Sequence, residues 1–115
     1  ILERVARCLE GRPRLTQRMP HQGAISHLVC WVDTDHAECL CTRRSTSGGV
    51  IALGRSIAYT YSKGLAVIAL GPSKVEYYGL VSGVSQCMGL SALMADWWIR
   101  VRTHIWMEVT TGIAI

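Results

Sequence analysis

The chain of 115 residues is poor in charged residues and has no long apolar run. Only 17% of its residues are charged and 50% are hydrophobic, which excludes a disordered tail or a solvated linker. No segment reaches the roughly 20 apolar residues that a membrane-spanning helix needs, and the first residues lack a signal-peptide pattern. The composition therefore predicts one intracellular globular domain without a membrane segment.

The five cysteines are an odd number without regular spacing, so we expect reduced thiols rather than a disulfide framework. A formal net charge of +4 favours a polyanionic partner such as nucleic acid. The first residue is not methionine, and the sequence stops shortly after the turn-like segment 110–112. We therefore expect a piece cut from a longer polypeptide.

Three segments in the first half have the character of strands. Residues 26–32 form a nearly continuous apolar run, as in a strand that is buried on both faces. Residues 47–53 and 56–61 flank Gly54-Arg55, a pattern typical of a β-hairpin. The sequence predicts an antiparallel meander, preceded by a short helix that ends near Gly11 and by a connector over residues 12–24.

The second half predicts a helix and a fourth strand. From residue 73 to about 98, one apolar stripe has helical spacing, and Gly79, Gly83 and Gly89 weaken the helix unless they allow close approach to the sheet. We expect Trp97 and Trp98 in the core or at a domain interface. Residues 99–107 alternate as a strand does, and the long helix allows it to return parallel to the first strand by a right-handed crossover.

Three acidic residues are candidates for one site. Asp33 follows the first predicted strand and Glu108 the fourth, and sites form at the carboxyl ends of parallel strands. Glu76 shares the apolar stripe of the helix, so its side chain should face the sheet. Clustered carboxylates suit two divalent cations, with magnesium the natural metal. On position alone, Asp33 is equally a turn residue, Glu76 part of a Ser-x-x-Glu capping box that begins at Ser73, and Glu108 a polar strand end.

Residues 31–37, Trp-Val-Asp-Thr-Asp-His-Ala, and 43–50, Arg-Arg-Ser-Thr-Ser-Gly-Gly-Val, closely resemble the signature of the ribonuclease H domain in copia-type retrotransposon Pol polyproteins. Residues 67–78 are similar to the next element of that family, which opens its central helix. Residues 7–13 resemble the segment that joins reverse transcriptase to ribonuclease H. The resemblance implies that residues 1–24 are the end of that connector and that residues 25–115 are a partial ribonuclease H-like domain.

The implied fold is α/β, with a ribonuclease H-like mixed sheet of three antiparallel strands, a crossover helix and a fourth parallel strand, incomplete at its C-terminal end. By the same resemblance Asp33, Glu76 and Glu108 are catalytic metal ligands for two Mg²⁺ ions, which Mn²⁺ can replace. The implied activity is endonucleolytic hydrolysis of RNA in RNA–DNA hybrids during reverse transcription. The implied nucleic-acid contacts are Arg43, Arg44, Ser45, Thr46 and Ser47.

The implied partners are the hybrid and the reverse transcriptase region of the same polyprotein, in a cytoplasmic virus-like particle or the nucleus. The chain departs from the family at Lys74 and Pro72, and His36 replaces a tryptophan. Glu108 stands where the family has an aspartate, and its extra methylene displaces the carboxylate. The fourth acid, on a later helix, has no counterpart. We therefore expect a truncated, degenerate copy with very weak or absent hydrolysis.

Three other interpretations remain open. His36, Cys39 and Cys41, with Cys30 nearby, have side chains that suit zinc, although Cys-x-Cys is a poor match to the usual knuckle. A second interpretation is a nucleic-acid-binding module without catalysis, in which scattered basic residues contact phosphates and Trp31 or Tyr59 stacks on bases. The third is a remnant of a decayed element without selected function. The basic residues concerned are Arg43, Arg44, Arg55, Lys63 and Lys74.

Overall fold

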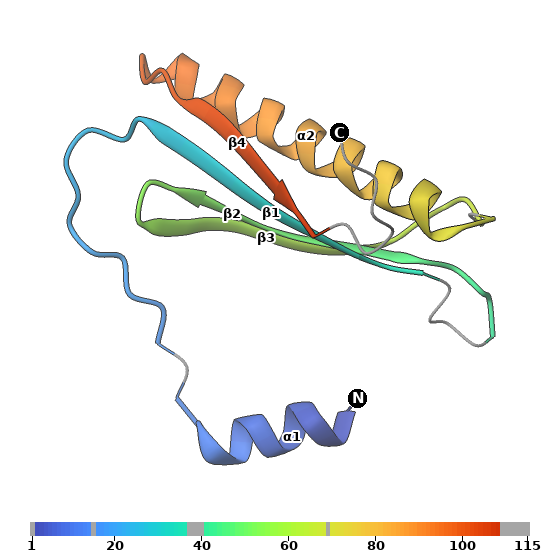
Figure 1. Cartoon of the computed structure of the whole chain (residues 1–115). Helices are drawn as coiled ribbons and strands as arrows, with labels where there is room; N and C mark the ends of the chain where they lie inside the picture. Colours follow the sequence, from blue (N-terminus) through green and yellow to red (C-terminus); the bar gives the residue numbers. More distant parts are fainter. Residues whose placement is uncertain (1, 15, 37–40, 69, 109–115) are drawn as a thin grey trace.

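The structure, a computed structural model, describes residues 2–14, 16–36, 41–68 and 70–108. Its elements in chain order are α1 (Leu2–Gly11), β1 (His27–Asp35), β2 (Thr46–Leu53), β3 (Ser56–Gly64), α2 (Pro72–Asp96) and β4 (Arg102–Met107). The strands form one sheet in the order β3-β2-β1-β4, in which β1, β2 and β3 are antiparallel and β4 is parallel to β1 (Figure 1). The predicted α/β mixed sheet, with a helix before the fourth strand, is confirmed.

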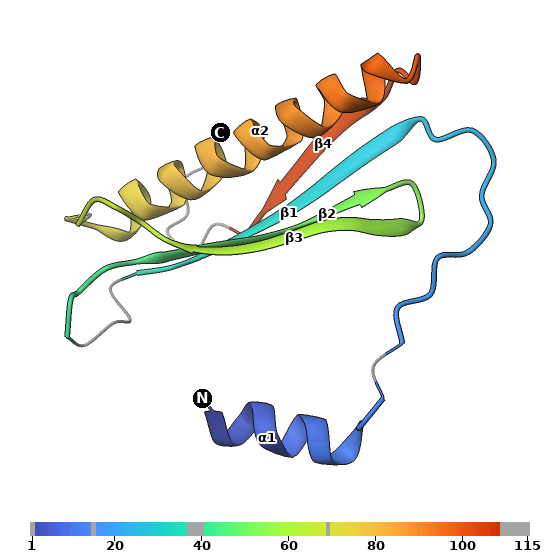
Figure 2. The same cartoon turned by 180° about the vertical axis from the view of Figure 1, so that it is seen from behind.

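Strand β1 is buried on one face only. Leu28, Cys30 and Val32 point toward α2 and form the core with Ile51 of β2, because alternate side chains of a strand point to opposite faces. On the other face Trp31 keeps 48% of its surface exposed. The expectation of a strand buried on both faces is therefore wrong, since among the described residues α2 alone packs on the sheet (Figure 2).

The β2–β3 hairpin turns at the predicted Gly54-Arg55 pair. Gly54 has a φ of +58°, a conformation that glycine adopts without the steric penalty of a side chain. The connector reaches this turn, because Gln22 Nε2 donates to the Leu53 carbonyl at 3.1 Å and Gln22 Oε1 accepts from the Arg55 N–H at 2.8 Å. Part of the connector is thus bonded to the sheet domain.

Helix α2 lies directly on β1 because two of its glycines face the sheet. A Cβ atom on Gly79 would lie 2.1 Å from Thr34 Cγ2, and one on Gly83 would lie 2.5 Å from Val32 Cγ2. Gly89, by contrast, has no neighbouring atom within 4 Å of such a Cβ. The predicted close approach is confirmed for the first two glycines and is wrong for the third.

The two ends of α2 differ from their predictions. The helix begins after Gly71, with Pro72 at its start and no side-chain hydrogen bond at the cap, so Ser73 does not cap it and the capping-box interpretation is wrong. Proline suits this position because its missing N–H would be unpaired there. At the other end Trp97 and Trp98 are 63% and 95% exposed, so neither belongs to the core, while their predicted place at a domain interface stays a prediction.

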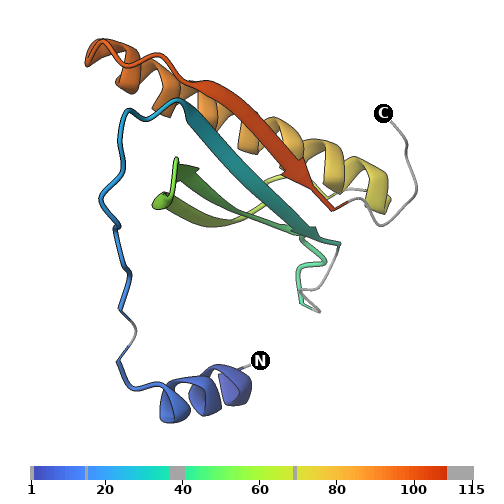
Figure 3. The same cartoon turned by 60° about the vertical axis from the view of Figure 1, so that its left-hand side comes forward.

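Helix α1 stands apart from the sheet. Among the described residues none of α1 is buried, and it packs on neither the sheet nor α2. Figure 3 shows it beyond the sheet face that α2 leaves uncovered. No helix in the described part of the chain is long and apolar enough to cross a membrane.

Candidate functional site

Asp33 and Glu108 line the same pocket, of about 540 Å³, on the face of the sheet that α2 leaves uncovered. The last pair between the parallel strands is Val32 with Met107, so each acid comes one residue after that pair. The two carboxylates therefore belong to neighbouring positions at the carboxyl ends of β1 and β4. This is the edge of the sheet at which the sequence placed them.

Asp33 lies inside β1 rather than after it, which corrects the predicted strand end. Pairing with β2 continues past the point where β4 stops, through Asp33 with Gly48 to Asp35 with Thr46. The Asp33 side chain is exposed, and its Oδ1 accepts a hydrogen bond from the Thr34 N–H at 2.9 Å. This bond holds the carboxylate in one orientation at the rim of the pocket.

Glu76 reaches the same end of the sheet from the opposite face. It is only 6% exposed, as its place on the apolar stripe of α2 predicts. Gly83 lies over Val32 and Gly79 over Thr34, so the helix runs antiparallel to β1 and the turn that carries Glu76 lies beyond Thr34. Glu76 is not among the residues that line the pocket. The structure thus brings together two of the three predicted acids.

The pocket offers a partial fit to magnesium. Two carboxylates supply hard oxygen ligands of the kind that Mg²⁺ takes, with water completing its coordination shell. A two-ion centre needs more, and in the parts of the chain that the structure describes no three His, Cys, Asp or Glu side chains are grouped so that they could hold a metal ion. Among the described residues Asp33 and Glu108 are therefore the candidate ligands of a divalent cation, and the pair of magnesium ions stays a prediction.

The predicted nucleic-acid contacts include both exposed and buried residues. Arg43 and Arg44 are exposed just before β2 and remain available to phosphates. Ser45 and Ser47 are 1% and 0% exposed, and Thr46 is half-buried. The two serine side chains therefore cannot be the direct contacts that the resemblance implied, because both are buried in the interior.

The prediction of a zinc site with Cys30 nearby is wrong. Cys30 is buried in the core, where its thiol contacts that of Cys87. It lies five residues before the end of β1, so about 16 Å of strand separates it from Asp35, the residue before His36. Cys39 lies outside the described residues.

The sequence interpretation did not include Trp106 in the site. Trp106 pairs with Trp31 across the parallel strands, and both indoles line the pocket beside the acids. The alternation of residues 99–107 already placed Trp106 on the face opposite Ile105, but only the strand register places it next to Trp31. The pocket thus combines two anionic groups with two exposed aromatic rings.

Comparisons with protein-family models, with curated proteins and with solved structures found no match to this chain.

Proposed function

We propose that this chain is a ribonuclease H-like domain of the kind found in copia-type retrotransposon polyproteins, with weak, metal-dependent hydrolysis of RNA in RNA–DNA hybrids. The observation that carries the proposal is the pocket shared by Asp33 and Glu108 at the ends of two parallel strands. The family-like signature over residues 31–50 assigns a metal to the same Asp33. The sheet order and the helix before the parallel strand are compatible with this fold.

In this proposal Asp33 and Glu108 would hold the divalent cation, whereas Glu76, on the opposite face of the sheet, does not line the pocket. A divalent cation held there would activate a water molecule and stabilise negative charge on the phosphate. Asp33 is oriented for this role by the Thr34 N–H. Two features limit the rate: the longer side chain of Glu108 and the burial of Glu76 on the other face of the sheet.

The test is cleavage of an end-labelled RNA–DNA hybrid in magnesium or manganese. We expect slow cleavage by the parent chain, none by Asp33→Asn, and faster cleavage by Glu108→Asp, which restores the family's shorter carboxylate. Asp96→Asn is the matched control, because Asp96 is an exposed aspartate at the end of α2 and lines none of this pocket. Absence of cleavage by all variants in both metals rejects the catalytic proposal.

Nucleic-acid binding without catalysis is the second candidate. It is favoured by the absence of a grouped three-ligand metal site among the described residues and by the exposure of Arg43 and Arg44. In that case hybrid binding weakens steeply as salt is raised, while no variant cleaves. Substitution of both arginines by glutamine then reduces the salt dependence, whereas under the catalytic proposal the decisive residue is Asp33.

A further inference from the structure

The uncovered face of β1 and β4 carries a graded series of side chains, which we call the β1–β4 ladder. Its rungs are residues opposite one another in the parallel pairing. The first three rungs are His27 with Arg102, Val29 with His104, and Trp31 with Trp106. The next positions along both strands are the acids Asp33 and Glu108, which line the pocket with the tryptophans. The ladder thus runs from a basic end through an aromatic centre to an acidic end.

The aromatic centre is open to solvent. Trp31 is 48% exposed and Trp106 is 63% exposed. Helix α2 lies on the other face of the sheet, as Figures 1 and 2 show from opposite sides. Exposed aromatic groups that lie together on one surface mark a binding site more often than isolated ones do. The pair is therefore placed to receive a flat ligand.

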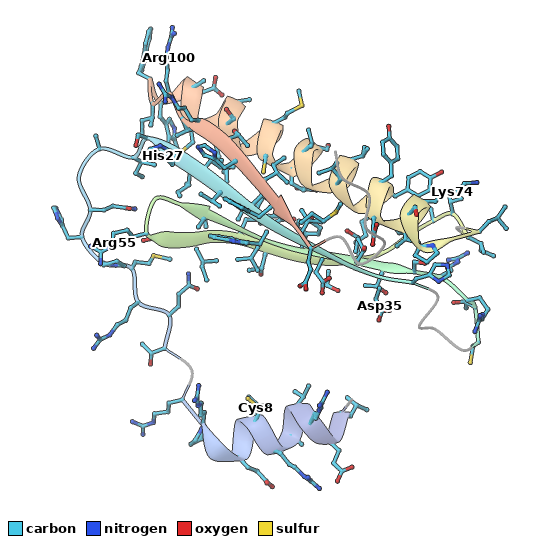
Figure 4. The ribbon with its side chains drawn as sticks, in the orientation of Figure 1. Cys8, His27, Asp35, Arg55, Lys74 and Arg100 are labelled. Carbon is cyan, nitrogen blue, oxygen red and sulfur yellow. The ribbon has the colours of Figure 1, made fainter. Side chains whose placement is uncertain are left out.

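The side chains at the basic end of the ladder also contact one another. The rings of His27 and His104 stack with centroids 5.6 Å apart and an angle of 29° between their planes. Arg102 lies beside His27, and Arg100 precedes it along the chain. Figure 4 shows His27 and Arg100 at one end of the sheet and Asp35 toward the other. Arg102 therefore lies two rungs from the tryptophan pair, on the side away from the acids.

We propose that the β1–β4 ladder binds a single-stranded stretch of nucleic acid. Unpaired bases stack on Trp31 and Trp106, and the phosphates of the same strand contact Arg102 and its neighbours. Stacking on exposed rings requires bases that are not hidden in a double helix, and cationic side chains beside the rings suit the phosphates of the strand. An uncharged or purely apolar ligand would leave the basic rungs without a role.

The dimensions of the ladder agree with this occupant. Successive rungs are two residues apart, or about 6.6 Å, so the basic and aromatic rungs together span about 13 Å. That length accommodates a few nucleotides in an extended conformation. The inference goes beyond the proposed function, because the strand bound here is unpaired whereas the proposed substrate of hydrolysis is a paired RNA–DNA hybrid.

The test uses the full chain and fluorescently labelled oligo-dT and oligo-U, with binding followed by anisotropy in EDTA. We expect Trp31→Leu and Trp106→Leu each to weaken binding roughly tenfold, the loss of one stacked base. Tyr77→Leu is the matched control, since Tyr77 is 64% exposed on α2, on the opposite face of the sheet, and it should bind as the parent does. Arg102→Gln should lower the slope of log affinity against log salt by about one.

A second probe tests the parent protein without any substitution. An abasic oligomer has the same phosphates but no bases, so it should bind more weakly than oligo-dT binds to either single tryptophan variant. Equal affinity for the abasic oligomer and oligo-dT overturns the proposal, and so does tighter binding of a fully paired hybrid than of either single strand. Unchanged affinity of both tryptophan variants also overturns it.

Failure of this inference is distinguishable from failure of the proposed function. Asp33→Asn should retain binding in EDTA, because the basic and aromatic rungs do not include it. If the tryptophan variants bind more weakly but no variant cleaves the hybrid, the catalytic proposal is rejected and the binding role of the ladder stands. If the parent chain cleaves the hybrid but both tryptophan variants bind as tightly as the parent, the binding role of the ladder is rejected and the catalytic proposal stands.

Discussion

Two buried thiols meet where α2 crosses β1. Cys30 and Cys87 are almost fully buried. Burial raises the pKa of Cys87 to about 12, and the neighbouring Cys30 thiol adds to the shift. Burial likewise raises the pKa of Cys30. Both side chains therefore behave as small apolar groups, because only the thiolate is reactive.

The Cys87 shift makes stability depend on alkaline pH. In the unfolded chain Cys87 ionises near its ordinary pKa of 9.0, whereas in the folded chain it stays protonated until about 12. The folded state binds more protons in that window, so this contribution is complete below pH 9 and is lost as pH rises toward 12. Each such group contributes a slope of up to about 1.4 kcal/mol per pH unit.

Urea unfolding at about pH 8 and about pH 10.5 measures this loss. We expect Cys87→Ala to reduce the difference in the free energy of unfolding between the two pH values. Any loss of packing that the substitution causes is the same at both pH values and cancels in this difference. Cys8→Ala is the control and should leave the difference unchanged, because Cys8 is exposed on α1. A parent chain with equal stability at both pH values would contradict the assigned burial of the thiol.

At the scale of elements, the contact between α2 and β1 depends on glycines, which have no side chain to hold the helix away from the strand. Gly79 and Gly83 bring the helix backbone close to Thr34 and Val32. The same close packing buries Ser47 Oγ and the Tyr61 hydroxyl, and neither of these atoms has a hydrogen-bond partner in the described structure. The contact is thus tight but incompletely satisfied in its polar groups.

We predict opposite effects for alanine at these glycines and at Gly89. Gly79→Ala and Gly83→Ala should each lower the free energy of unfolding by about 1–3 kcal/mol, since the new methyl group overlaps the side chain of Thr34 or of Val32. Gly89→Ala should raise it by about 1 kcal/mol, because the added methyl group meets no neighbour and alanine favours the helix. Urea unfolding at neutral pH provides the comparison. Equal stabilisation by all three substitutions would show that α2 is not seated on β1.

The elements themselves were largely predictable from local patterns. Alternation and helical spacing located the strands and α2, because those periods reflect which face is buried. The start of α2 was not predictable from the sequence, because Pro72 and the Ser-x-x-Glu pattern are competing start signals. Only the structure shows that Gly71 precedes the first turn. The end of β1 was missed because its pairing with β2 carries the strand past the last apolar residue to Asp35.

For the site, sequence placed Asp33 and Glu108 at one edge but not Glu76 relative to them. Strand order determines that the first two are neighbours, and a topological rule supplied it. The face from which a helix residue approaches depends instead on which helical turn rests on which strand residue. That register is determined by Gly79 on Thr34, a contact that no sequence spacing reveals.

At the scale of the whole molecule, the chain is more extended than a packed domain of its length. Its radius of gyration is 16.4 Å, against about 13 Å for a compact chain of about 100 residues. The difference follows from α1, which lies away from the sheet (Figure 3). The connector after it is bonded to the hairpin, through Gln22 and through Gln17 Nε2, which donates to the Ile57 carbonyl at 2.8 Å.

Two shortened chains should separate these parts. A variant that begins at residue 13 lacks α1, and its free energy of unfolding should stay within about 0.5 kcal/mol of the parent, because α1 buries nothing. A variant that begins at residue 25 also loses the hydrogen bonds of Gln17 and Gln22, and should lose about 1–3 kcal/mol. Equal stability of the two variants would support the domain boundary at residue 24 that the resemblance implies.

The parallel pairing of β1 with β4 has a mechanical consequence. These are the first and last described strands, they lie side by side, and they point the same way. A force that pulls the two ends of the domain apart therefore acts along the strands and loads all of their mutual hydrogen bonds in shear at once. A domain held in this way within a stretched polypeptide resists extension more strongly than one whose terminal strands can be unzipped bond by bond.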